Sequence, residues 1–131
     1  MIRVVRDNHE ATRVNVHVRE HAFVSDMGLS DGGGDEGPDP HDLYDSALGA
    51  CKALTMLWYA RRKGIPIGDV EVSVERDRSR EREGHYLLTT TLQIGGDLSD
   101  AHRAELLSVA EKCPVHKLMT QVTTEIITQL A

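Results

Sequence analysis

The residues of this chain that could do chemistry are its two cysteines, Cys51 and Cys113. Cys51 lies between Ala50 and Lys52 in an apolar stretch, and Cys113 directly precedes Pro114. A thiolate is both a nucleophile and a metal ligand, so each thiol has a reactive interpretation. Each also has a structural one: Cys51 as a small buried hydrophobe and Cys113 as a helix cap. Taken singly, neither cysteine decides between the two interpretations.

Cys113 stands where a helix is expected to start, and His116 follows one helical turn later. Free backbone amides and the positive end of a helix dipole stabilise a thiolate, which predicts a lowered pKa for Cys113. In this setting His116 is either a surface histidine or one that supports the thiolate. Cys113 and His116 could also bind zinc if Cys51 and His41 completed a Cys2His2 set. Structural zinc sites usually contain two tight pairs, and only one is present here, so we expect no metal.

Other catalytic motifs are missing from the sequence. Ser46 lies in Asp-Ser-Ala rather than in a Gly-x-Ser-x-Gly elbow. There is no GxGxxG motif, and the glycines at 32–34 lack the lysine and the following helix of a phosphate-binding loop. The carboxylates fall in loops that we expect to be exposed. We therefore predict no cofactor and no acid–base pair of carboxylates.

The composition limits the class of protein. A length of 131 residues suits one domain, expected to cover 1–131, and 40% hydrophobic with 27% charged residues is typical of a globular chain. The net charge of -6 disfavours nucleic-acid or anionic-membrane partners, which require a positive field. No apolar run approaches the roughly 18 residues of a membrane span, and the charged N-terminus does not resemble a signal peptide. We expect a cytoplasmic protein, where a structural disulfide is disfavoured.

The strongest helical pattern covers residues 40–63 and contains Cys51. Asp39 is a suitable N-cap, Pro40 suits the first position, and Gly64 followed by Pro66 ends the pattern. Apolar residues occur on more than one side, so we expect this helix to be buried on most sides.

The remaining elements alternate between strands and helices. Period-2 patterns predict N-terminal strands that include Val4, Val14–Val18 and Phe23–Val24, further strands at 70–74 and 85–94, and a last strand at 122–130. Helices are predicted at 99–112, capped by Ser99, and in a short turn after Cys113. Residues 28–37, with five glycines, are expected to form a flexible loop or a lid. This order indicates an α+β fold with antiparallel sheet.

Two segments resemble the OsmC/Ohr family. Residues 37–43 (GPDPHDL) with 47–51 (ALGAC) are similar to the segment around that family's first cysteine, and 110–116 (AEKCPVH) to the segment around its second. Residues 59–64 and 70–72 fit as well. The resemblance covers most of the chain from about residue 20 onward.

This resemblance implies an OsmC-like fold with a long buried central helix, in an intertwined homodimer. It implies a thiol-dependent peroxidase that reduces organic hydroperoxides in an antioxidant, oxidative-stress role. Cys51 would be the peroxidatic thiol and Cys113 the resolving thiol, with a dithiol as reductant. The sequence departs from the peroxidase pattern at His41, where those enzymes carry a glutamate that supports an activating arginine. Arg13 and Arg19 are the possible counterparts of that arginine.

Two further hypotheses remain beside the peroxidase. One is a non-catalytic OsmC-like protein that binds a small molecule in the same apolar cleft, and the other is the zinc protein considered above. A homodimer is also expected from the apolar surface of the helix at 40–63. One sheet and a short helix cannot cover all of its apolar sides, and a second copy of the chain could cover the rest. Met56 and Trp58 are the residues we expect one chain to leave uncovered.

Overall fold

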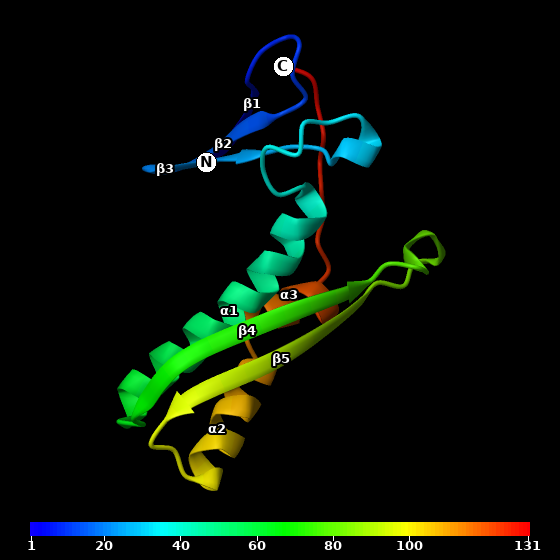
Figure 1. Ribbon diagram of the computed structural model, residues 1–131. Coiled ribbons are helices and arrows are strands. Elements are labelled where there is room, and N and C mark those ends of the chain that lie inside the picture. Colours follow the sequence, from blue (N-terminus) through cyan, green and yellow to red (C-terminus); the bar gives the residue numbers. More distant parts are fainter. The chain divides into compact units, whose positions relative to one another are not determined.

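The computed structural model describes residues 1–131 and divides into two compact units, Met1–Asp45 and Ser46–Ala131. Helix α1 (Pro40–Lys63) begins in the first unit and continues into the second (Figure 1). The single domain expected over 1–131 stays a prediction. No helix is both long and apolar enough to cross a membrane.

The first unit is a three-stranded antiparallel sheet in the order β1-β2-β3. Its strands are β1 (Ile2–Arg6), β2 (Val14–Val18) and β3 (His21–Ser25), as the alternating pattern predicted. The β2–β3 turn requires a left-handed backbone at Arg19, with φ 52°. β1 is exposed along its whole length, and Val16 is the buried centre of β2.

Residues 28–37 fold around the buried carboxylate of Asp26 rather than forming an open loop. Asp26 Oδ1 accepts hydrogen bonds from Thr12 Oγ1 and, at 2.8 Å, from the Met27 amide, while Oδ2 accepts from the Glu36 amide at 3.2 Å. The segment contains a short 3-10 turn, Leu29–Asp31. A Cβ at Gly37 would lie 2.3 Å from the Val24 carbonyl oxygen, so this close approach requires glycine.

The second unit is built on a two-stranded antiparallel hairpin, β4 (Ile67–Asp77) and β5 (Leu87–Gly96), joined by a charged loop with a 3-10 turn at Glu81–Glu83. Cross-strand pairs alternate between the two faces. Val70 opposite Ile94 and Val72 opposite Leu92 face the core, whereas Glu71 opposite Gln93 is exposed. Both strands were predicted; the structure extends the predicted strand at 70–74 in both directions and shifts the predicted strand at 85–94 by two residues.

Helix α1 and helix α2 (Asp100–Glu111) pack on the apolar face of this hairpin (Figure 1). Ser99 caps α2 as predicted, through a hydrogen bond from the His102 amide at 3.1 Å. Helix α3 (Pro114–Thr120) follows directly, with Cys113 as its N-cap residue. The fully buried core is formed by side chains from both long helices and the turn after α1: Met56, Ala60, Ile65, Leu106 and Ala110.

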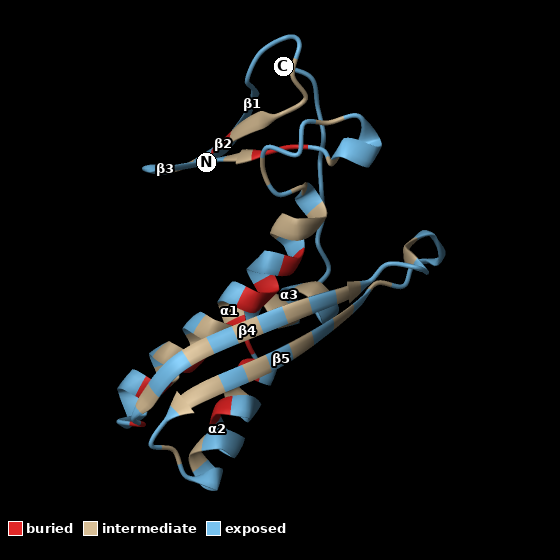
Figure 2. Ribbon diagram, viewed as in Figure 1, coloured by how far each residue is buried: buried red, intermediate tan, exposed pale blue.

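Helix α1 has the predicted boundaries and caps. The Asp42 amide donates to Asp39 Oδ1 at 2.8 Å, and the Asp39 amide donates to Asp42 Oδ2 at 3.0 Å. Gly64 ends the helix with a φ of 67°. Within one chain the helix is buried on one face and open on another (Figure 2).

Two sequence expectations are wrong. Met56, expected to stay uncovered, is fully buried against α2, whereas Trp58 is 56% exposed as expected. Residues 122–130 form no strand, although their polar and apolar residues alternate. The alternation defines two faces but supplies no hydrogen-bonding neighbour, and a strand requires both.

Candidate active site

Cys51 lies on the partly open face of α1, near the first turn of α3. Its Sγ accepts a hydrogen bond from the Val115 backbone amide at 3.4 Å and lies 3.9 Å from Thr55 Oγ1. Val115 is the second residue of α3, so this amide has no acceptor within the helix. The sulfur therefore accepts a main-chain donor from the first turn of α3.

Cys113 occupies the junction between α2 and α3 and is completely buried. Its amide donates to the Ala110 carbonyl oxygen at 3.3 Å. Burial raises the pKa of the Cys113 thiol, and the neighbouring Cys51 thiol raises it further. The His116 amide and the Lys52 ammonium oppose this rise without cancelling it.

The predicted lowering of the Cys113 pKa is therefore wrong. The sequence correctly placed this residue at a helix start, but it did not show how completely the side chain would be enclosed. Desolvation disfavours the charged thiolate and outweighs the nearby amide. The Val115 amide of the same helix start donates to the sulfur of Cys51, at 3.4 Å.

An apolar groove opens beside Cys51. It has a volume of about 640 Å³, and its walls are formed by α1 and the first residue of α3. The polar side-chain atoms of this lining are the Cys51 thiol, the Thr55 hydroxyl and the Trp58 indole N–H, so the groove offers an apolar molecule a surface with one thiol. The lining residues are Ala47, Ala50, Cys51, Leu54, Thr55, Trp58 and Pro114.

Lys52 is the functional candidate that the sequence analysis missed. Its side chain is 4% exposed, and its Nζ donates to the Ala110 carbonyl oxygen at 2.8 Å and contacts His116 Nδ1 at 3.0 Å. His116 therefore contacts a buried lysine. A lysine in an amphipathic helix is normally expected on the exposed face. The burial of Lys52 is evident only from the position of the Ala110 carbonyl group at the end of α2.

The other predicted candidates lie elsewhere. Arg13 forms ion pairs with Asp7, at 2.7 Å, and with Glu36 in the first unit. Arg19 is in the β2–β3 turn, and His41 is in the first turn of α1. No group of three or more histidine, cysteine, aspartate or glutamate side chains is arranged to hold a metal ion.

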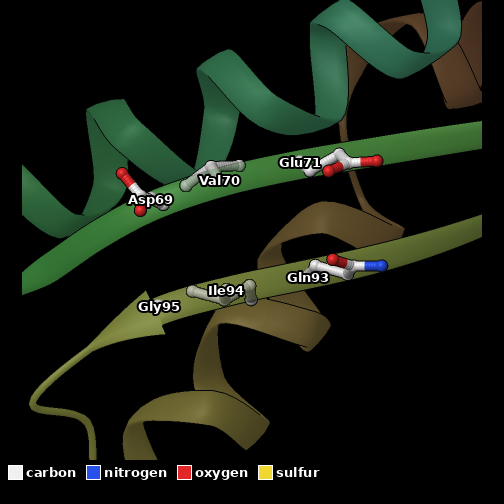
Figure 3. A pocket seen from close by; sticks show the side chains of 6 residues that line it. All are labelled: Asp69, Val70, Glu71, Gln93, Ile94 and Gly95. Carbon is white, nitrogen blue, oxygen red and sulfur yellow. The ribbon is translucent and has the colours of Figure 1, made fainter.

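A second hollow of about 660 Å³ lies on the β4–β5 hairpin (Figure 3). Its side chains include the carboxylates of Asp69 and Glu71 and the amide of Gln93, and it contains no thiol. This hollow offers no nucleophile, so Cys51 and its groove define the candidate active site.

Comparison with known proteins identifies the family. Residues 32–127, well over half of the chain, match the family described as OsmC-like protein. The chain therefore belongs to the OsmC-like family, and the predicted α+β OsmC-like fold is confirmed. No curated protein sequence matches the chain.

Solved structures show the same fold at low sequence identity. The OsmC-like protein from Mycoplasma pneumoniae is 22% identical, with a TM-score of 0.75 over 93% of this chain and 87% of that one. The organic hydroperoxide resistance protein OhrB of Bacillus subtilis is 22% identical, with a TM-score of 0.60 over 92% and 91%. The organic hydroperoxide resistance protein OsmC of Legionella pneumophila is 17% identical, with a TM-score of 0.62 over 92% and 88%. These likenesses show the shared fold.

Proposed function

We propose that this protein is a cysteine-based peroxidase that reduces organic hydroperoxides. Cys51 is the attacking thiol in this proposal, and Cys113 is the resolving thiol. The observation that carries it is the position of Cys51 Sγ, which lines an apolar groove and accepts the Val115 amide at 3.4 Å. The cited neighbours named as organic hydroperoxide resistance proteins support the same substrate class.

The chemistry follows from the two environments. The Cys51 thiolate attacks one oxygen of the O–O bond, which breaks as an S–O bond forms; the alkoxide takes a proton and leaves as an alcohol. Cys51 is then a sulfenic acid. Cys113, buried beside it, attacks that sulfur and releases water as the disulfide forms. A dithiol reductant returns both residues to thiols.

The groove favours an organic over an inorganic peroxide. Its lining is mostly aliphatic and aromatic, so an alkyl or aryl hydroperoxide gains buried apolar contact that hydrogen peroxide does not.

We also propose that the protein acts as a homodimer in the cytoplasm. Leu54 and Trp58 are 64% and 56% exposed on the groove side of α1. A two-fold partner would cover such residues symmetrically. Reducing surroundings would keep both thiols available for another cycle.

The decisive experiment measures turnover of cumene hydroperoxide with a dithiol reductant. Wild type is expected to turn over, Cys51→Ser to be inactive, and Cys113→Ser to consume about one equivalent of peroxide. Ser46→Ala in the same helix is the control and should turn over like wild type. Wild-type turnover no faster than that of Cys51→Ser would overturn the proposal.

The second candidate is a binding protein without peroxidase activity, favoured by the apolar lining of the groove. Intact mass after one equivalent of organic hydroperoxide separates the two. Loss of two hydrogens without added oxygen reports the Cys51–Cys113 disulfide, whereas an unchanged mass together with a retained small molecule supports binding alone.

A further inference from the structure

The buried lysine of α1 has a defined pair of partners. Lys52 Nζ lies 2.8 Å from the Ala110 carbonyl oxygen, at the end of α2, and 3.0 Å from His116 Nδ1, in the first turn of α3. An ammonium group only donates, so His116 Nδ1 is the acceptor of a hydrogen bond from the Lys52 ammonium. Lys52 thus connects α1 to both helices that meet at Cys113.

The same contacts connect Lys52 to the backbone at Cys113. The Ala110 carbonyl oxygen that accepts from Lys52 Nζ also accepts the Cys113 amide, at 3.3 Å. The backbone amide of His116 also lowers the pKa of the Cys113 thiol through a hydrogen bond. The ionisable groups around this thiol are Cys51 and Lys52 from α1 and His116 from α3; α2 contributes only backbone. Lys52 is the cation among them.

A structural connection between two acceptors does not need a charge. A neutral donor would join the Ala110 carbonyl to His116 without the desolvation that burying an ammonium entails. An enclosed thiol that must ionise during reaction, in contrast, gains directly from a fixed positive charge. The Coulombic effect of Lys52 on Cys113 has this sign.

We propose that Lys52 is a positioning residue whose buried ammonium stabilises the Cys113 thiolate. The inference rests on the proposed function for its role in turnover. There, Cys113 sulfur donates an electron pair to the Cys51 sulfenic sulfur, an S–S bond forms and the S–O bond breaks. The thiol proton combines with the departing hydroxide to give water, and Lys52 keeps its proton throughout.

The first test is independent of peroxide. In a Cys51→Ser background Cys113 is the sole cysteine, and its ¹³Cβ chemical shift reports its ionisation. Adding Lys52→Met should move the titration midpoint upward by about one pH unit, that is about tenfold less thiolate at a given pH. Lys52→Arg should stay near the unmodified midpoint. An unchanged midpoint in Lys52→Met, or an equal shift in Lys52→Arg, would overturn the proposal.

Lys112→Met provides a matched control. It removes the same charge one residue before Cys113, but from an exposed side chain, so the midpoint should hardly move. Should Lys52→Met fail to fold, His116→Phe tests the same charge by removing one of the two acceptors that hold it. The midpoint of the Cys113 titration should shift in His116→Phe, and an unchanged midpoint would count against the proposal.

The second test measures disulfide formation in protein with both cysteines. After one equivalent of hydroperoxide, Lys52→Met should oxidise Cys51 at the wild-type rate and form the disulfide about three- to tenfold more slowly. Equal disulfide rates would refute the role in turnover. If wild type itself does not react with peroxide, the proposed function fails, while the titration still decides whether Lys52 stabilises the Cys113 thiolate.

Discussion

At the start of α3, one backbone amide donates to Cys51 while Cys113 occupies the capping position. Cys51 is partly exposed in the groove, and Cys113 is fully buried with a raised pKa. Two thiols at the same helix terminus therefore differ in access to solvent. This difference in access is consistent with the proposed function, in which Cys51 attacks the external molecule and Cys113 performs the internal step.

This asymmetry predicts selective labelling. A short pulse of iodoacetamide on the reduced native protein should alkylate Cys51 at least about tenfold faster than Cys113, because the enclosed thiol is both inaccessible and largely protonated. Peptide mass analysis measures the two rates. In denaturant both cysteines should react alike, and equal labelling in the native protein would contradict the assignment.

Asp26 predicts a pH-dependent stability. Its hydrogen bond with Thr12 is the largest cause that holds the Asp26 pKa below its ordinary value of 3.8. A lowered folded-state pKa contributes stability above the unfolded-state pKa of about 3.9, and that contribution is lost as the pH falls through the folded-state value. Asp26→Asn should therefore be less stable than wild type at pH 7, and the difference should shrink below about pH 4.

Urea unfolding at pH 7 and at pH 3 measures this difference. Asp31→Asn is the control, since Asp31 is an exposed carboxylate in the same segment. It should leave the urea midpoint close to that of wild type at both pH values. If the free energies of unfolding of wild type and Asp26→Asn differed equally at both pH values, the role of the Asp26 charge would be contradicted.

At the scale of elements, the α1–α2 contact should dominate the stability of the second unit. Leu106 is fully buried against Met56 and Ala60, while Leu107, the next residue of α2, is 49% exposed. Leu106→Ala should reduce the free energy of unfolding by about 2–5 kcal/mol. Leu107→Ala should cost less than about 1.5 kcal/mol in urea unfolding, and a reversed order would contradict the packing.

The helices were predictable because their signals are local. Asp39, Pro40 and Gly64 define the ends of α1 by capping chemistry, and Ser99 does the same for α2. The strands β4 and β5 were predictable for the same reason, since each alternates over its own length. These signals can be recognised from neighbouring residues alone, without knowing which distant residues they contact.

The errors come from properties that depend on distant partners. Residues 122–130 alternate, but the chain provides no strand beside them. Met56 was expected on an uncovered side because the sequence does not show which face of α1 meets α2. Lys52 was missed because its burial depends on a carbonyl 58 residues later. The candidate cysteines were found through motifs, whereas the complete burial of Cys113 and its raised pKa required the structure.

At the scale of the whole molecule, exposed apolar side chains on α1 predict self-association. Trp58 stacks with Arg62, whose guanidinium carbon is 5.0 Å from the ring centroid, yet more than half of Trp58 stays exposed. Sedimentation at low micromolar concentration should give twice the chain mass of 14.5 kDa. Trp58→Glu should shift the protein toward monomer, because a charge would be buried in an apolar interface.

Ser73→Glu is the matched control for this prediction. It introduces the same charge on the exposed polar face of β4, and it should sediment like wild type. A wild-type monomer that is well folded and still reacts with hydroperoxide would show that the second copy is not required.

The donor to Cys51 belongs to the main chain at Val115, and this has an evolutionary consequence. Every residue except proline carries that amide, so mutational drift at position 115 can replace the side chain many times without removing the donor. Under the proposed function, selection would then be visible at Cys51 itself and at the proline that starts the helix, while position 115 varies with its packing. Val115→Pro is the single exchange there that deletes the donor, whereas Val115→Ala retains it.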